Sequence, residues 1–316
     1  VFIDPQSETE MLKEDIFPKD FIYSLKPPTN YFGTQKIFED KSYKTVQIIE
    51  DHNENFPLKH KKDWDGGTIF DSLIESINTF LIANVIRDFY EGNRNNSHRS
   101  MLINVSRFIN VQEKFEDLVK NVFENIMNAI RHTEALKLDD ALKNKYIYDL
   151  YTAYTNHYSG EFNWEAIFSS LFIANKNVQI YKLPFKDKKR KLDYDKHEDN
   201  GLRVIIIGGL ALSRGLTLEG LTVSYLYRTT ATFDVLLQMG RWFGYRDKPK
   251  NYEHLCKVWM PKKTLSYFEE ISRSIKGLKT DFEKLIDSGK SPVDFGIRVR
   301  NESEELGITS RSKMRN

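Results

Sequence analysis

The sequence predicts an α/β fold, a parallel, doubly wound sheet with a helical insertion. Short apolar runs typical of buried strands recur along the chain, at residues 101–105, 178–182, 203–207, 222–226 and 257–260. Loops and helical stretches separate them, including a helix expected at about 233–242, and this alternation is typical of a parallel sheet covered by helices on both faces. Residues 111–175 keep a helical spacing of apolar side chains throughout, which predicts a helical subdomain that stands aside from the sheet.

Two regions of different character divide the chain. Residues 1–66 are interrupted by prolines, and we expect an irregular N-terminal segment with candidate strands at 21–25 and 45–49. Residues 67–316 are expected to form the α/β domain. Its first element is predicted to be an amphipathic helix over 68–90, where apolar residues recur at three- and four-residue spacing.

The composition limits the class of protein. A hydrophobic content of 40% and an aromatic content of 13% argue against disorder. No apolar run approaches the ~20 residues that span a bilayer, and the N-terminus has no secretory signal. The single cysteine, Cys256, suits a reducing compartment, so we expect a cytoplasmic protein without a membrane partner. The net charge of +2 is nearly balanced, whereas proteins that grip duplex DNA mainly by electrostatics are usually more basic.

Two segments carry the functional argument. Residues 204–221 run from a buried strand into a glycine-punctuated loop that contains a hydroxyl and a guanidinium, and residues 238–246 hold two arginines beside glycines. Open α/β sheets bind ligands at the carboxyl ends of their strands. Exposed N–H groups at that edge suit phosphate oxygens. The pattern therefore indicates a phosphate-binding edge of the sheet.

Both segments resemble motifs of superfamily-two helicases. Ser213-Arg-Gly-Leu-Thr-Leu-Glu-Gly220 resembles motif V, Gln238-Met-Gly-Arg-Trp-Phe-Gly-Tyr-Arg246 resembles motif VI, and Met101-Leu-Ile-Asn-Val-Ser-Arg107 resembles the motif IV region. A narrower resemblance is to the Z-one domain family, described as endonucleases; it lies in residues 212–221 and 238–246 and in the closing segments Asp294-Phe-Gly296 and Ile308-Thr-Ser-Arg-Ser-Lys-Met-Arg315. The resemblance covers most of the chain. It implies a RecA-like fold of the P-loop NTPase superfamily, as in the C-terminal motor domain of a helicase.

The resemblance also implies roles for single residues. Motif VI would supply arginine fingers to a nucleotide, from Arg246 or Arg241, with Gln238 positioning the nucleotide. The two arginines depart by one position each from the common helicase spacing; the resemblance favours Arg246, at the far end of the motif, with Arg241 as the alternative. Motifs IV and V would contact a nucleic-acid backbone or couple it to ATP, through Ser106, Arg107, Ser213, Arg214, Gly215, Thr217 and Glu219.

The sequence contains no Gly-x-x-x-x-Gly-Lys-Ser/Thr phosphate cradle, and no metal site is predicted. The resemblance implies that ATP and Mg²⁺ bind the full-length protein through a missing N-terminal RecA-like domain, and we expect neither to bind this chain alone. The first residue, Val1, is not an initiator methionine, which fits a piece of a longer protein. The expected partner is the backbone of DNA or RNA, and the implied setting is a bacterial restriction or defence system.

Alternative readings stay open. Asp193, Asp195 and Glu198 form an acidic group that a magnesium-dependent nuclease could use, although no buried strand flanks it. A second alternative is a non-catalytic module that uses the same fold to bind another protein. For single residues, Arg241 or Arg246 could instead make an interdomain salt bridge, and Arg214 could pair with Glu219.

Overall fold

A single parallel sheet forms the centre of the protein. The computed structural model describes residues 23–51, 56–64, 67–92, 96–183, 192–209, 218–228, 230, 232–242, 244–246 and 251–289. Six strands lie in the order β2-β8-β6-β3-β5-β4, and every neighbouring pair is parallel. They are β2 (Val46–Ile49), β3 (Arg99–Asn104), β4 (Gln179–Lys182), β5 (Arg203–Ile207), β6 (Leu221–Leu226) and β8 (Lys257–Pro261). The four inner strands are buried at every position, because helices cover both faces.

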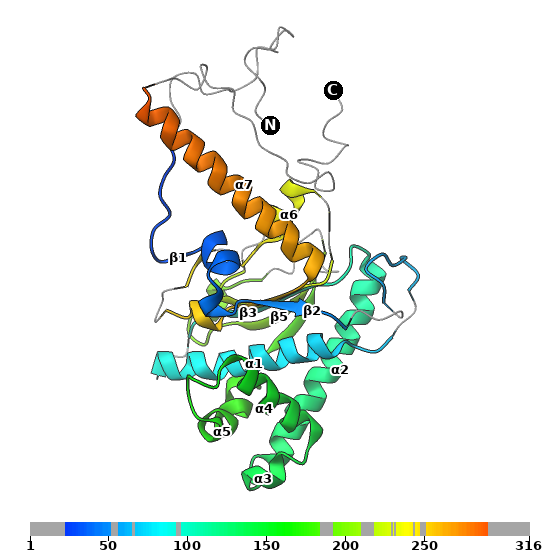
Figure 1. The fold of residues 1–316 in the computed structure, drawn as a ribbon. Helices are drawn as coiled ribbons and strands as arrows, with labels where there is room; N and C mark the ends of the chain where they lie inside the picture. The colour runs from blue at the N-terminus through cyan, green and yellow to red at the C-terminus, as the bar shows by residue number, and fades with distance from the viewer. Residues whose placement is uncertain are drawn as a thin grey trace.

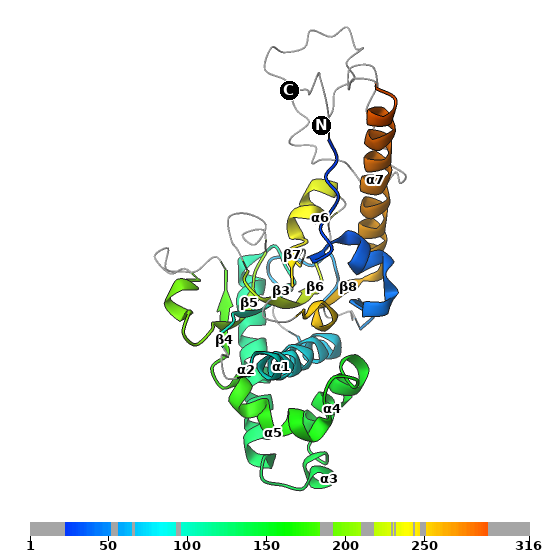
Figure 2. The ribbon, with the colours of Figure 1, turned by 90° about the vertical axis from the view of Figure 1, so that its left-hand side faces the viewer.

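One face of the sheet is covered by α1 (Asp71–Glu91) and α2 (Ile109–Thr133) (Figure 1). Beyond α1, farther from the sheet, lie α3 (Leu138–Ala141), α4 (Lys145–His157) and α5 (Trp164–Asn175) (Figures 1 and 2). Because α1 has the sheet on one side and α4 and α5 on the other, it is buried around most of its circumference. Asn84 of α1 donates to Asn175 of α5 at 3.0 Å, which satisfies part of the polar surface in this contact.

The opposite face carries α6 (Phe233–Met239) and the first half of α7 (Lys262–Asp287), whose second half extends away from the sheet (Figures 1 and 2). Phe268 of α7 stacks on Phe38 of the π-helical turn η1 (Gln35–Glu39), with ring centroids 5.3 Å apart. A second, two-stranded antiparallel sheet joins β1 (Tyr31–Phe32) to β7 (Gly244–Tyr245). Residues near the start of the chain therefore hold the segment that follows α6.

The five strands predicted from apolar runs all lie in the parallel sheet, and the mixed α/β class is confirmed. The arrangement is compatible with a RecA-like fold. The sheet also takes in β2 from the segment expected to be irregular, whereas residues 23–25 of the other candidate strand have no regular structure. The helix predicted over 233–242 ends at Met239, because Gly240 leaves helical geometry with φ −72° and ψ 64°.

Residues 111–175 are helical as predicted, but they do not stand wholly aside. The helix α2 packs directly against β4 and β5, and the buried side chains of the helices and the sheet form one continuous core. The reason is that the same apolar stripe that predicts α2 needs the sheet to cover it. Among the described residues, no helix has the length and apolarity needed to cross a membrane.

Candidate functional site

The adjacent strands β3 and β6 end side by side at the carboxyl edge of the sheet, and the place where the chain parts after them is called the crevice here, the usual term for this position in open α/β sheets. The chain leaves β3 toward α2 on one face of the sheet and leaves β6 toward α6 on the other (Figure 1). The carbonyl of Asn104, at the end of β3, accepts from the amides of Tyr227 at 3.0 Å and Arg228 at 3.1 Å, just before the two segments part. Parallel sheets bind ligands at such a switch point. This crevice is therefore the candidate site.

Ser106 follows the carboxyl end of β3 by two residues and is fully buried. Its Oγ accepts from the amide of Phe108 at 3.0 Å and lies 2.7 Å from Nε2 of His60. The Nδ1 of His60 lies 3.2 Å from the carbonyl oxygen of Pro57. A carbonyl only accepts, so Nδ1 carries the proton and Nε2 accepts from the Ser106 hydroxyl. The hydrogen bond thus ties loop 56–64 to the end of β3.

The ring of His60 is held neutral by its surroundings. Burial lowers the pKa of His60, the hydrogen bond to Pro57 opposes that effect, and the charge of Arg107 lowers the pKa further. A neutral imidazole can keep accepting from Ser106 near pH 7. The link between loop and strand is therefore intact at that pH.

Two arginines follow these strand ends, Arg107 after β3 and Arg228 after β6. Arg107 is exposed, with its guanidinium carbon 4.7 Å from the centroid of the Phe108 ring. Arg228 is half-buried, and its Nη1 is buried without a hydrogen-bond partner among the described residues. Burial, and then the charge of Arg107, lower the pKa of Arg228. Two neighbouring guanidinium groups with an unused buried donor form a site suited to an anion.

The chain that leads from β5 toward the motif V segment lies at the same edge of the sheet. A side chain at Gly209 would place its Cβ 2.5 Å from Nε2 of Gln112 and 2.8 Å from the carbonyl oxygen of Ser106, so only glycine allows this approach. Gly208 also donates its amide to Ile103 of β3 at 3.0 Å. The predicted residues Ser213, Arg214, Gly215 and Thr217 lie outside the described residues.

Glu219 lies at the opposite edge of the sheet from Ser106. Its carbonyl accepts from Oγ of Ser100, at the amino end of β3, at 2.7 Å, and its carboxylate lies 3.8 Å from Nε2 of His98. The next residue, Gly220, has a φ of 64°, and a Cβ there would lie 1.7 Å from the carbonyl oxygen of His98. The chain is therefore at the carboxyl edge at Gly209, before the motif V segment, and at the amino edge at Glu219 and Gly220, where that segment ends.

The motif VI residues are also distributed unevenly. Gln238 lies in α6, half-exposed, and Arg241 lies half-buried in the turn that follows. Arg246 is only 8% exposed and donates to three backbone carbonyls, those of Leu221, Tyr245 and Trp242. Leu221 begins β6, so Arg246 lies roughly 16 Å from the carboxyl end of that strand, given the rise of a parallel strand. The structure does not bring Arg246 to Ser106 and Arg107.

His60 and Arg228 complete the crevice but were not singled out by the sequence. Arg228 comes shortly after the apolar run of β6, as Arg107 comes shortly after the apolar run of β3. This repeated pattern is the sequence signal by which Arg228 could have been predicted. For His60 the sequence offers no such signal, because it meets Ser106 only through the path of loop 56–64. Among the described residues, no group of histidine, cysteine and acidic side chains could hold a metal ion.

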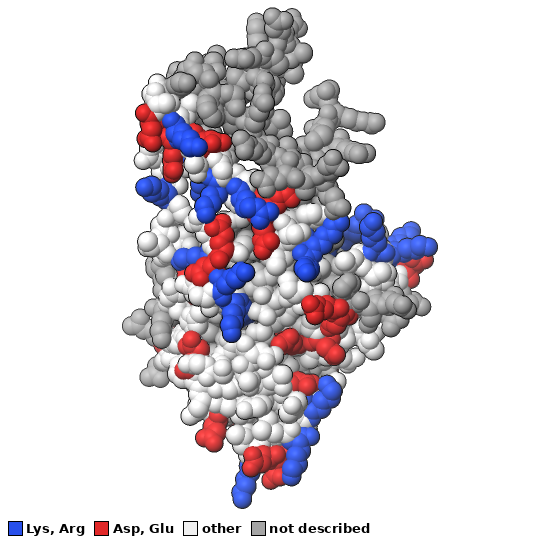
Figure 3. Space-filling view, in the orientation of Figure 1, with Lys and Arg blue, Asp and Glu red and all other residues white. Residues whose placement is uncertain are grey.

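Basic side chains extend the crevice onto the surface. Lys59, Lys61 and Lys62 are exposed on the loop that His60 ties to Ser106, with Asp63 as their acidic neighbour. Figure 3 shows Lys and Arg side chains gathered on the right of the molecule, where Figure 1 places this loop and the beginning of α2. The surface beside the crevice is therefore positively charged.

The comparisons with known proteins give one match. The family model of the Z1 domain (the Z-one domain of the sequence resemblance) matches residues 72–306, which include β3, β5, β6, β8 and every described element of the crevice except loop 56–64. Neither a curated protein nor a solved structure matches the chain. Since the model matches most of its length, the chain belongs to the Z1 domain family.

Proposed function

We propose that the chain is the second RecA-like domain of a helicase-like, nucleic-acid-dependent ATPase, and that the crevice between β3 and β6 binds backbone phosphates of DNA or RNA. The observation that carries the proposal is the pair Arg107 and Arg228 at the switch point of a parallel sheet. One guanidinium is exposed, and the other keeps a buried Nη1 without a partner among the described residues. A phosphate oxygen is the acceptor that such a pair fits, because a planar guanidinium can donate two hydrogen bonds to it.

The surroundings suit a nucleic-acid strand better than a small anion. The lysines at 59, 61 and 62 continue the positive charge outward from Arg107, so successive phosphates would meet successive cations. Contacts of this kind position a backbone without reading its sequence. The His60–Ser106 hydrogen bond holds the lysine loop against the crevice, which makes the two parts one surface.

ATP hydrolysis would need a partner domain. The sequence has no phosphate cradle, so the proposal assigns ATP and Mg²⁺ to an N-terminal RecA-like domain and gives this chain the arginine that completes the site. Arg241 suits that role better than Arg246, whose guanidinium is committed to three carbonyls of its own chain. The bacterial restriction or defence setting remains part of the same proposal.

The nucleic-acid contact is tested by the double variant Arg107→Gln/Arg228→Gln, which removes both charges and keeps polar side chains. Fluorescence anisotropy with a labelled single-stranded oligonucleotide, repeated over a series of salt concentrations, gives affinity and its salt slope. If each arginine neutralises one phosphate, the slope of log K against log salt should fall by about 1.4 in the variant. The same titration with a duplex and with RNA identifies the preferred strand.

The matched control is Arg131→Gln/Lys137→Gln. Both residues are exposed near the far end of α2. The control therefore removes the same charge, but Arg131 lies roughly 33 Å along the helix axis from the first residue of α2. We expect the control to keep the wild-type slope and to bind only slightly more weakly at every salt concentration. Equal slopes for the crevice variant and wild-type protein would refute the proposed contact.

A further inference from the structure

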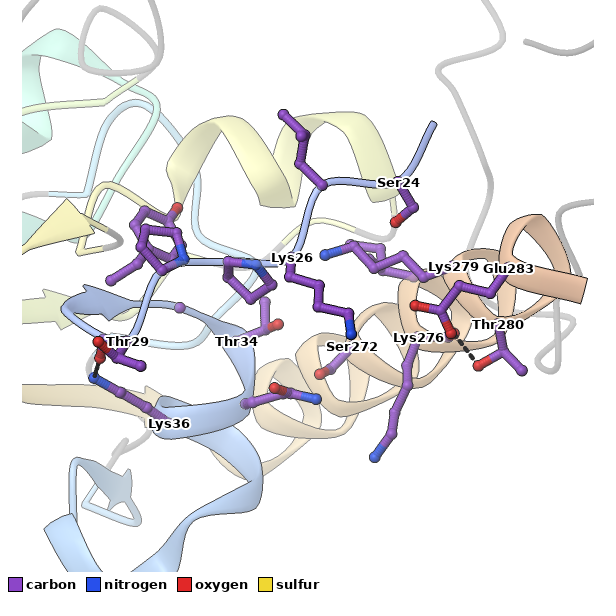
Figure 4. A pocket seen from close by; sticks show the side chains of 17 residues that line it. Ser24, Lys26, Thr29, Thr34, Lys36, Ser272, Lys276, Lys279, Thr280 and Glu283 are labelled. Atoms are coloured by element: carbon purple, nitrogen blue, oxygen red, sulfur yellow. Dashed lines mark hydrogen bonds between the residues drawn. The ribbon is translucent and has the colours of Figure 1, made fainter. Parts of the chain in front are cut away.

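A second cavity lies far from the crevice, between the segment 24–36 and the second half of α7. Its volume is about 460 Å³, within the range of small-molecule sites. Figure 4 shows it from close by, with the N-terminal segment on one side and α7 on the other. Four lysines line it, Lys26, Lys36, Lys276 and Lys279, against one acidic side chain, Glu283. The cavity is therefore basic.

Two of these lysines are already neutralised. Lys36 donates to Glu253 at 2.7 Å and to the carbonyl of Thr29 at 2.7 Å, and Lys276 lies 3.1 Å from Glu39. Lys26 and Lys279 make no ion pair with any described residue. Figure 4 shows both reaching into the gap, Lys26 from the N-terminal segment and Lys279 from α7, while Lys276 points away. Two ammonium groups from opposite walls thus face the same space.

The rest of the lining divides into hydroxyls and apolar surface. Thr34 and Ser272 lie beside the lysines, and the hydroxyl of Ser272 donates to Glu39 at 3.1 Å. The apolar part includes Leu25, Tyr31 and Ile275. The lining therefore offers both cations and apolar side chains.

We propose that this cavity binds a small phosphate-bearing molecule that also carries a flat ring, the chemistry of a nucleotide. The ammonium groups of Lys26 and Lys279 hold the phosphoryl oxygens, because paired cations from two walls can share the charge of a polyphosphate. The ring lies against Leu25, Tyr31 and Ile275. The inference goes beyond the proposed nucleic-acid contact and does not rest on it, since no residue of the crevice lines this cavity.

The cavity adjoins the motif VI segment. Tyr31 pairs with Tyr245 across the small sheet, and their ring centroids lie 5.5 Å apart in an edge-to-face arrangement. A ligand in the cavity would therefore stiffen β1 and, through it, β7. Binding there has a structural route to the turn that carries Arg241.

Isothermal titration at low ionic strength, without Mg²⁺, tests the proposal with inorganic triphosphate and with ATP as probes. Contrary to the expectation from the sequence that ATP does not bind this chain alone, we expect both to bind at one site per chain, and ATP more tightly because its base adds contact with the apolar side chains. In the double variant Lys26→Ala/Lys279→Ala, both affinities should fall about tenfold or more, since each lost lysine removes a charge-assisted hydrogen bond. Both positions lie at the surface, and urea unfolding checks that the variant remains folded.

The matched control is Lys143→Ala/Lys145→Ala, which removes two exposed lysines near the start of α4. It should bind both probes as wild-type protein does. Failure of wild-type protein to bind triphosphate, or equal binding by the cavity variant, would overturn the phosphate site. Equal affinities for ATP and triphosphate would overturn the assignment of the ring to the apolar side chains. Loss of oligonucleotide binding in the cavity variant, with the Arg107→Gln/Arg228→Gln protein unaffected, would instead assign the cavity to the nucleic-acid path.

Discussion

The Nε of Arg246 donates to the carbonyl oxygen of Leu221 at 3.1 Å, which fixes the last residue of motif VI to the first residue of β6. Its two terminal nitrogens donate to the carbonyls of Tyr245, at 2.8 Å, and Trp242, at 3.2 Å. The guanidinium thus closes the turn after α6 and anchors it on the amino edge of the sheet. In a motor domain this arginine would hold the motif in place, and Arg241 would be the remaining candidate for the finger.

Replacing Arg246 should therefore affect stability first. Arg246→Ala leaves three carbonyls without their donor at a buried position, and we expect the free energy of unfolding to fall by about 3 kcal/mol or more. Arg246→Lys should keep only part of this free energy, because a single ammonium group cannot donate to all the carbonyls that the planar guanidinium reaches. Urea unfolding measures both variants. Arg241→Ala is the control, with an expected loss below about 1 kcal/mol, and equal losses for Arg241→Ala and Arg246→Ala would contradict this account.

The complementary prediction concerns turnover in the protein that contains the ATP-binding domain. Arg241→Ala should lower nucleic-acid-stimulated ATP turnover by roughly a thousandfold, with little change in nucleotide affinity, because an arginine finger acts mainly on the transition state. Steady-state turnover and equilibrium nucleotide binding, measured separately, give the two quantities. Wild-type turnover in this variant would show that Arg241 takes no part in the reaction.

A buried ion network at the amino edge of the sheet should be essential for folding. Arg99 is fully buried and pairs with Asp88 and with Glu91, the latter at 3.1 Å, while Arg203 lies 3.0 Å from Asp88. Arg99→Met would leave Glu91 buried with only part of its countercharge, and we expect a loss of about 3–5 kcal/mol in urea unfolding.

The control for this network is an exposed ion pair of similar length. Lys143 lies 2.7 Å from Asp140, with both side chains more than half exposed. Lys143→Met should change the free energy of unfolding by less than about 1 kcal/mol. A loss from Arg99→Met no larger than this would mean that the buried network contributes nothing.

Lys257 should give the protein a distinctive pH dependence. Burial lowers its pKa to about 8, although its Nζ donates to the carbonyls of Tyr43 at 2.8 Å and His254 at 3.1 Å. An unfolded lysine keeps a pKa of roughly 10.4. Between these values the unfolded chain holds a proton that the folded chain has released, so stability should rise as the pH rises through this window.

Lys257→Met removes the titrating group and should flatten that rise. The difference in free energy of unfolding between wild-type protein and variant should change by about 2 kcal/mol between the two ends of the window, and stay constant below it. Urea unfolding at a series of pH values measures it. A parallel pH dependence in both proteins would show that Lys257 keeps an ordinary pKa when folded.

The sheet could be predicted from sequence because its strands are short, apolar runs with helices between them. The runs at 203–207 and 222–226 match β5 and β6 almost residue for residue, since strands buried on both faces are largely apolar, here with only Arg203, Thr222 and Ser224 as exceptions. The edge strand β2 was harder to place. It is buried only at Ile49, and its preceding and following residues carry no helical pattern that would tie it to the sheet.

The crevice could be predicted only in part. Ser106 and Arg107 follow a recognisable strand, so their place at its carboxyl end was expected. The position of Arg246 could not be, because its guanidinium reaches Leu221, 25 residues earlier in the chain, and the choice of the amino edge depends on that packing. His60 likewise reaches Ser106 across 46 residues of sequence. Contacts of this range come from the fold and leave no local pattern.

Amide hydrogen exchange with and without a single-stranded oligonucleotide tests the central claim most directly, because it reports where the strand lies. We expect slower exchange at residues 104–108 and 226–228, which form the crevice, and at the lysine loop 58–62. The amino-edge residues 98–100 and 219–221 serve as the internal control and should exchange at unchanged rates. Protection confined to the amino edge, or none in the crevice at saturating oligonucleotide, would contradict the assignment of this site to nucleic-acid phosphates.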